Sequence, residues 1–308
     1  MLSNRSKGIL AIIVSAFGFA LMGFFVRLAD DFGGSVSSFQ KSLFRNLVAL
    51  VVAAVAYARA RPHSPPRPSL LAAWLLLLRS VLGTIGIFAN FYALGRVPIA
   101  EAQTLNKTAP FFTVLFAWLF LSERIGLRQI LTLSLAFVGA LFVAKPGFAG
   151  AAAFPLAIGL MSGVCAGGAY ACVRGLRRLE VSPALIILFF SGFSSLAALP
   201  FIIGHYDPMT LAQIVILSGA GLGAAVGQFG VTLAYGFAAP NEIAVFDYTS
   251  VLFSAALGFV FFAQLPDVWS IVGFVAILFA ASRLSLSTSK PSRIGRCPLA
   301  AEGDSQAP

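Results

Sequence analysis

The sequence predicts an all-α membrane protein whose ten transmembrane helices form two inverted five-helix repeats. Three observations support this prediction: a composition poor in charge, ten apolar stretches separated by short polar breaks, and a similarity between the two halves. Of the 308 residues, 59% are hydrophobic and 10% are charged, whereas a soluble domain carries about 25% charged residues. So few charges cannot cover a water-facing surface, which argues against a soluble enzyme, a nucleic-acid-binding protein and a disordered protein.

The ten apolar stretches approach or exceed the roughly 20 residues of helix that cross a bilayer. Breaks fall where charges, glycine and proline cluster, as at 59–68 and 145–147. The first stretch is expected to stay as a helix, because its 19 residues exceed the apolar core of a cleaved signal peptide. The expected spans are 8–26, 37–57, 70–94, 99–121, 127–144, 155–173, 183–203, 212–238, 243–263 and 268–284.

The basic residues predict that both termini lie in the cytoplasm, since cytoplasmic loops carry an excess of lysine and arginine. With this orientation the outer side keeps three loop residues, Arg27, Arg96 and Lys145. The net charge of +10 is then explained mostly by basic residues that set the orientation in the membrane. The chain is therefore expected to interact with the lipid bilayer and not with a nucleic acid. The inner side collects fourteen basic residues, namely Arg5, Lys7, Arg59, Arg61, Arg67, Arg124, Arg128, Arg174, Arg177, Arg178, Arg283, Lys290, Arg293 and Arg296.

The second half of the chain repeats the pattern of the first at an offset of about 141 residues. Both copies have a proline before a Glu-containing helix entry, a polar patch, a long Phe/Leu run and a Gly-containing final span. Residues 1–147 and 148–284 are therefore expected to be two five-helix units, with a disordered cytoplasmic tail at 285–308. Five is odd, so the second unit enters the membrane in the opposite sense, which suits alternating access.

Four ionisable residues fall inside the predicted spans, where such groups face a bundle interior, a partner or a wet cavity. Arg45, Arg79 and Lys107 each lie about 8 or 9 residues into a span, hence roughly 12 to 13 Å deep. Asp247 lies early in the ninth span. The cations are expected to attract a carboxylate-bearing solute, while Asp247 balances charge or carries a proton. The alternative is permanent salt bridging, such as Asp247 with Lys107, that fixes helices and touches no solute.

The fourth span carries a polar face next to a proline. Gln103, Lys107 and Pro110 share one helical face, with Asn106 beside it. Pro110 removes a backbone donor near mid-membrane and leaves a carbonyl unpaired, so it is the predicted hinge.

The third and ninth spans carry polar faces of their own. Asn90 shares a glycine-lined face with Arg79, and Tyr248 and Ser250 lie close to Asp247. At the repeat offset the fourth- and ninth-span patches correspond, so they are expected to face each other across a central cavity. The predicted substrate-binding set is Arg45, Arg79, Asn90, Gln103, Asn106, Lys107, Tyr248 and Ser250.

Features of catalysis are missing from the sequence. It contains no Walker-type G-x-x-x-x-G-K-[ST] and no H-E-x-x-H, and one deep acid cannot supply the paired groups of an intramembrane hydrolase. The three cysteines have no metal-ligand spacing. No enzyme activity, cofactor or metal is therefore expected.

Glu123 is expected at an interfacial helix start, and the glycine ladders of the sixth and eighth spans are expected to pack helices closely.

The stretch RSVLGTIGIFANFYALGRVPIAEAQTLNKTAPFFTVLFAWLFLSERIG resembles the signature of the EamA family in the drug/metabolite transporter superfamily. It contains an arginine-led third helix with Arg79, the mid-membrane Pro110 and the Ser-Glu-Arg loop at 122–124. The segment around Arg45 resembles the family's second helix. In the second half, the loop at 264–267 departs from the family's Gly-Glu loop, which argues against strict symmetry.

The resemblance implies a ten-helix carrier in a bacterial inner membrane that moves small metabolites, often outward. Members handle amino acids, riboflavin, S-adenosylmethionine or opine-type metallophores. We therefore expect a secondary active exporter of an amino-acid-like or other organic anion, and a homodimer is compatible with this. The alternative function is a non-transporting membrane scaffold or sensor whose buried charges only lock the helices.

Overall fold

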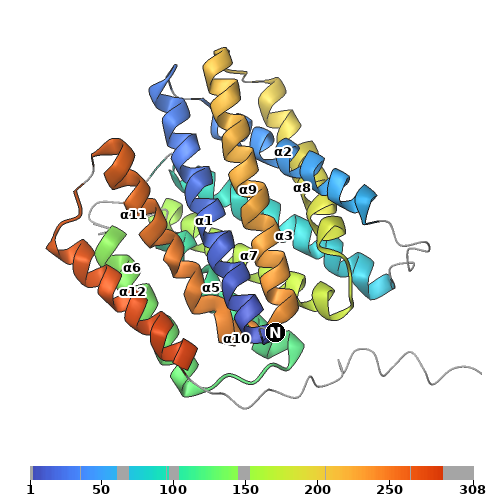
Figure 1. Ribbon diagram of the computed structural model, residues 1–308. Helices are drawn as coiled ribbons and strands as arrows, with labels where there is room; N and C mark the ends of the chain where they lie inside the picture. Colours follow the sequence, from blue (N-terminus) through green and yellow to red (C-terminus); the bar gives the residue numbers. More distant parts are fainter. Residues whose placement is uncertain are drawn as a thin grey trace, which may run out of the picture.

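The computed structural model describes residues 3–34, 36–60, 69–94, 96, 104–144, 153–204, 206–263 and 265–286 (Figure 1). All regular structure in these residues is helical. The helices are α1 (Asn4–Asp31), α2 (Ser38–Arg59), α3 (Leu70–Leu94), α5 (Ala109–Leu121), α6 (Leu127–Ala144), α7 (Ala153–Arg178), α8 (Pro183–Ile203), α9 (Leu211–Phe237), α10 (Pro240–Ile243), the 3-10 helix η1 (Ala244–Tyr248), α11 (Thr249–Phe262) and α12 (Val268–Leu286). Predicted residues outside the described ranges are Arg61, Arg67, Gln103, Lys145, Lys290, Arg293, Arg296 and the rest of the tail from 287.

Nine helical segments in the described residues are long and apolar enough to cross a membrane, and the apolar part of α12, Val268–Leu284, is shorter. Three predicted spans, 70–94, 127–144 and 183–203, coincide with α3, α6 and α8. Large apolar side chains cover the outer faces: Ile203, for example, is 83% exposed. An apolar surface of this extent requires lipid around it, so the chain is a multi-pass integral membrane protein.

The fourth and ninth predicted spans are interrupted and do not form single α-helices. Residues 107 and 108 form a turn, and α5 begins after it, so Pro110 lies in the first turn of α5. A proline is tolerated there because its missing donor has no helical partner anyway. In the ninth span the chain passes through α10 and η1 before α11 begins. The prediction of one continuous helical face through Lys107 and Pro110, and of Asp247 in a regular helix, is therefore wrong.

Small residues bring several helix pairs into backbone contact. A Cβ added at Gly18 of α1 would lie 2.6 Å from the backbone nitrogen of Gly227 on α9, and one at Gly139 of α6 would lie 2.8 Å from the carbonyl of Gly273 on α12. Gly167 of α7 approaches the backbone of α5 in the same way. The predicted role of the glycine ladders as close-packing surfaces is confirmed.

The helix contacts come in matching sets (Figure 1). Helix α1 packs against α9 and α11, while α7 packs against α3 and α5; α2 contacts α8, and α6 contacts α12. Both α5 and α11 end at a residue in the left-handed conformation, Ser122 (φ 54°) and Ala263 (φ 52°). These two residues are 141 positions apart in the sequence.

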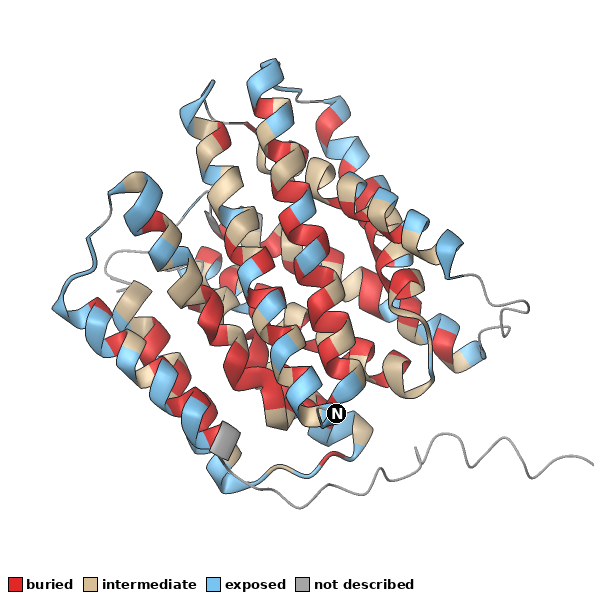
Figure 2. Cartoon of the chain, in the orientation of Figure 1, coloured by how far each residue is buried: buried red, intermediate tan, exposed pale blue. Residues whose placement is uncertain are grey.

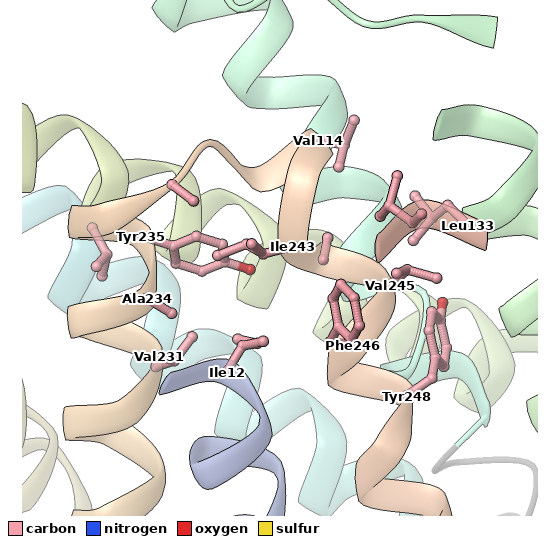
Figure 3. Close-up of a cluster of buried hydrophobic side chains, with 14 of the residues drawn as sticks. Ile12, Val114, Leu133, Val231, Ala234, Tyr235, Ile243, Val245, Phe246 and Tyr248 are labelled. Carbon is pink, nitrogen blue, oxygen red and sulfur yellow. The ribbon is translucent and has the colours of Figure 1, made fainter. Parts of the chain in front are cut away.

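A cluster of buried apolar side chains surrounds α10 and η1, where Figure 2 also shows many buried residues. Figure 3 shows Ile243, Phe246 and Tyr248 of this segment beside Ile12 of α1 and Tyr235 of α9. Because η1 also contacts α5, α6 and α12, tertiary packing holds this irregular segment, and with it Asp247, among these helices and α1.

Candidate functional site

Lys107 lies in the turn before α5 and reaches the segment that joins η1 to α11. Its Nζ donates to Oγ of Ser250 at 2.6 Å and lies 3.6 Å from Oδ2 of Asp247. The hydroxyl of Tyr248 donates to the backbone carbonyl of Lys107 at 2.8 Å. Lys107, Asp247, Tyr248 and Ser250 form the lysine cluster. The two sequence patches that correspond at the repeat offset are thus in direct contact.

The lysine cluster contains both signs of charge. The side chains of Lys107 and Asp247 are 26% and 20% exposed, and opposite charges this close largely neutralise each other's field. Ser250 completes the arrangement, since its hydroxyl donates to the backbone carbonyl of Asp247 at 2.7 Å. The cluster has the geometry of the internal salt bridge that the sequence left open as an alternative.

Arg79 lies in a different environment, between α3, α8 and α9. It is only 2% exposed. Its Cζ lies 3.7 Å from the ring centroid of Phe190 on α8, and Nη2 donates to Oε1 of Gln228 on α9 at 3.0 Å. Its Nε is buried without a hydrogen-bond partner. The guanidinium is therefore held by an aromatic face and a neutral amide, and neither of these cancels its charge.

Gly83 makes room for this guanidinium one turn along α3. A Cβ at Gly83 would lie 2.7 Å from Cε2 of Phe190 and would also collide with Nη1 of Arg79. The glycine-lined face predicted for the third span thus has a specific use: it lets a large cation lie flat against the helix.

Arg45 on α2 adds a second positive charge. It is partly exposed, and it makes no side-chain hydrogen bond or ion pair with any residue that the structure describes. It is close enough to Arg79 for the two charges to interact. We refer to Arg45, Arg79, Phe190 and Gln228 as the arginine cluster. In the described part of the chain, no carboxylate contacts it.

Tyr170 of α7 lies near charged residues of both clusters. It lies within electrostatic range of Arg45, Arg79 and Asp247, and its ring centroid is 5.9 Å from that of Tyr235 on α9. The deep charges predicted from the sequence therefore form two neighbouring groups.

The two predicted amides that the structure describes, Asn106 and Asn90, make no side-chain hydrogen bond to the described residues of either cluster. Asn106 donates from Nδ2 to Oγ of Ser162 on α7 at 3.1 Å, so it faces α7. Asn90 keeps a buried Oδ1 with no hydrogen-bond partner among the described residues. Gln103 lies outside the described residues.

Sequence reasoning missed Phe190, Gln228 and Tyr170. A signal existed for Gln228, because an amide in the middle of an apolar span is rare and usually bonds to another helix. Nothing in the local sequence distinguishes Phe190 from the many phenylalanines that face lipid.

Comparison with known proteins identifies the family. Residues 6–145 match the model of the EamA-like transporter family. A riboflavin transporter of Rhizobium johnstonii is 30% identical over 211 residues, which are 68% of this chain and 68% of that protein. The pseudopaline exporter CntI of Pseudomonas aeruginosa is 29% identical over 92% of this chain and 98% of its own length. The chain belongs to the EamA-like transporter family.

The fold is also found among solved structures. A crystal structure superposes on this EamA-like chain with a TM-score of 0.71 at 18% identity, and the match covers 92% of this chain and 97% of the other. A family of transporters, with relatives named as exporters and transporters, supports a transport role and not an enzymatic one.

The Ser-Glu-Arg loop of this EamA-like chain differs from its sequence prediction. Glu123 is 7% exposed and lies before α6, which starts at Leu127. Its Oε1 accepts from Nε of Arg174 at 2.8 Å and from Nη2 of Arg178 at 2.5 Å. Glu123 therefore does not stand at a helix start, which corrects that part of the prediction, and α7 extends beyond its predicted end and brings both arginines to this carboxylate.

Proposed function

We propose that this chain is a secondary active transporter, working as an exporter, that carries a small polar, carboxylate-bearing metabolite across the bacterial inner membrane by alternating access. The single observation that carries the substrate class is the arginine cluster. It holds two cations, contacts no carboxylate among the described residues, and leaves one buried guanidinium N–H without an acceptor. The printed names of the relatives, a pseudopaline exporter and a riboflavin transporter, support a small organic molecule as substrate.

The physical argument is one of charge compensation. Ionisable side chains inside a membrane are energetically costly and face a partner or a wet cavity. Two arginines within interaction range repel each other, so an arriving carboxylate lowers the energy of both. A guanidinium offers parallel N–H donors that match the two oxygens of a carboxylate. Arg45 and Arg79 are therefore the proposed anion-binding residues. The rest of the proposed substrate-binding set is Asn90, Gln103, Asn106, Lys107, Tyr248 and Ser250.

The lysine cluster has a second role in this proposal. Protonation of Asp247 would remove the countercharge of Lys107, so Asp247 is the proposed proton-coupling residue. The turn at residues 107 and 108, directly before Pro110 in α5, supports a hinge here. A hinge in this turn would move Lys107 relative to α11.

Alternating access rests on the proposed inverted repeat of ten spans, in residues 1–147 and 148–284. Two observations support it. The pairing of α1 with α9 has a counterpart in that of α7 with α3, and the left-handed ends of α5 and α11 are separated by the sequence offset of the repeat. Exchange of conformations between such halves would open the site to each side in turn. The basic residues favour cytoplasmic termini.

The test is transport by purified protein in proteoliposomes, with a panel of radiolabelled amino acids and dicarboxylates and with riboflavin as a substrate that lacks a carboxylate. We expect saturable uptake of a carboxylate. Arg79→Leu is expected to lower uptake about 100-fold or more, because it removes a buried charge partner. Arg79→Lys keeps the positive charge but loses the planar guanidinium. Its uptake is expected to lie between that of the wild-type protein and that of Arg79→Leu.

Arg283→Leu is the matched control, since Arg283 lies exposed near the end of α12, and wild-type uptake is expected. Size-exclusion profiles and thermal unfolding report whether each variant is folded. If Arg79→Leu alters stability or assembly while every flux stays unchanged, the scaffold or sensor function is correct and the transport proposal fails.

A further inference from the structure

An apolar groove runs along the outer face of the molecule where α1, α2 and α9 meet. Its volume is about 630 Å³. Helix α9 lines it from Leu222 to Phe237, α1 lines it from Lys7 to Val14, and α2 contributes Val52. In Figure 1, α1 and α9 lie side by side at the front of the view. Lys7 is the only charged or polar residue in this lining, so the groove has one cationic end.

Lys7 lies in the first turn of α1 and is exposed. Its Nζ is 5.9 Å from the ring centroid of Phe237, at the last turn of α9. Its side chain makes no hydrogen bond or ion pair with any residue that the structure describes. The positive charge therefore stands next to the apolar lining, and the part of the chain that the structure describes supplies no countercharge.

The groove lies along a rigid helix seam. The hydroxyl of Ser15 on α1 donates to the carbonyl of Gly227 on α9 at 2.7 Å. A Cβ at Gly230 would lie 2.8 Å from the carbonyl of Ala11. Because the two backbones touch here, α1 and α9 cannot move closer to fill the groove. Its shape is therefore set by the packing of the protein itself.

We propose that this groove binds one anionic phospholipid, with an acyl chain along α9 and the phosphate at Lys7. The lining of α9 extends over about 22 Å of helix axis, which exceeds one leaflet of a hydrocarbon core about 30 Å thick. An acyl chain therefore fits lengthwise in it. The lysine stands at the end where a headgroup would lie, and a lysine near the membrane surface attracts anionic lipid. A zwitterionic lipid fills the same groove but gains less from Lys7.

Native mass spectrometry of the purified full chain tests this proposal. The protein is reconstituted in vesicles with equal amounts of phosphatidylglycerol and phosphatidylethanolamine of the same acyl chains, then released, and the retained lipids are counted. The wild-type protein is expected to retain one phosphatidylglycerol, about fivefold in preference to phosphatidylethanolamine. Lys7→Ala is expected to remove the preference. Val226→Trp, which fills the groove, is expected to remove retention of both lipids.

Two controls match these variants. Arg59→Ala removes an exposed cation at the end of α2, outside the groove lining, and Val275→Trp adds the same bulk on the exposed face of α12. Both are expected to retain phosphatidylglycerol as the wild-type protein does, and thermal unfolding confirms that all variants are folded. Equal retention of the two lipids by the wild-type protein, or an unchanged preference in Lys7→Ala, would overturn the proposal. So would a wild-type dimer that Val226→Trp alone dissociates, because the occupant would then be a second copy of the chain.

Discussion

The two clusters of buried charge use opposite strategies. In the lysine cluster, the ammonium group of Lys107 has a carboxylate at 3.6 Å and a hydroxyl at 2.6 Å. In the arginine cluster, the guanidinium of Arg79 has an aromatic ring, a neutral amide and a neighbouring cation. The protein neutralises the charge of Lys107 with a carboxylate. It surrounds the charge of Arg79 with neutral groups that do not neutralise it.

This difference indicates where a solute has most to gain. A carboxylate that approaches Lys107 has to compete with Asp247, whereas one that approaches Arg45 and Arg79 meets no protein anion among the described residues. Sequence depth alone treats the three cations as equivalent. Their partners, which come from other helices, separate Lys107, which has a carboxylate nearby, from Arg45 and Arg79, which have none among the described residues.

The strongest test places a carboxylate in the arginine cluster, so that it contains both signs of charge, as the lysine cluster does. Gln228→Glu keeps the shape of a side chain whose Oε1 lies 3.0 Å from Arg79 but supplies the missing negative charge. We expect the affinity for the transported carboxylate, measured by proteoliposome uptake, to fall about 100-fold. The new glutamate forms an ion pair with Arg79 and so competes with the substrate.

Gln228→Met is the control for this substitution, since it removes the hydrogen bond without adding charge. Its expected loss is about fivefold, the worth of one modest hydrogen bond. Wild-type affinity in Gln228→Glu would show that Arg79 does not bind the substrate.

The next test removes one charged partner of the ion pair in the lysine cluster. Asp247→Asn or Lys107→Met leaves one mostly buried charge without its partner, and each is expected to lower the free energy of unfolding in detergent by about 1–3 kcal/mol. The double variant is expected to be more stable than either single one, because no orphaned charge remains. Thermal unfolding of the four proteins gives the comparison.

Asp247→Asn is also expected to abolish the response of transport to an imposed pH gradient. Asp30→Asn is the matched control, because Asp30 also pairs with a lysine, Lys41, but its own side chain is more exposed than that of Asp247, 36% against 20%. Unchanged proton coupling in Asp247→Asn would remove Asp247 from that role.

The smallest expected effect tests whether the position of Arg79 matters in addition to its charge. Gly83→Ala places a methyl group against Phe190 and Arg79, and the displaced guanidinium is expected to bind the carboxylate about five- to tenfold more weakly. Gly192→Ala on α8 is the control, since its added Cβ meets only Leu50 at an ordinary 3.7 Å. Equal uptake kinetics in the two variants would mean that the arrangement of Arg79 and Phe190 is not important for binding.

Much of the helix pattern could be predicted because the membrane imposes it. Long apolar runs must form helices there, since every backbone group needs an internal partner, and the spans at 70–94, 127–144 and 183–203 were placed correctly. The interrupted helices at 107–108 and 240–248 could not be predicted in the same way. Their freed backbone and polar groups bond to other helices, as Lys107 does with Tyr248, and local periodicity contains no information about those partners.

The amino-acid order alone is enough to predict that the chain crosses a membrane many times, that four charges lie within its spans, and that small residues let helices touch. These are properties of composition and spacing, which act within one segment. The packing of the helices is needed to show that Asp247 faces Lys107, that Phe190 and Gln228 hold Arg79, and that Glu123 is buried against two arginines. The energy of a buried charge depends on which groups other helices bring within a few ångströms of it, and that is fixed only when the helices pack.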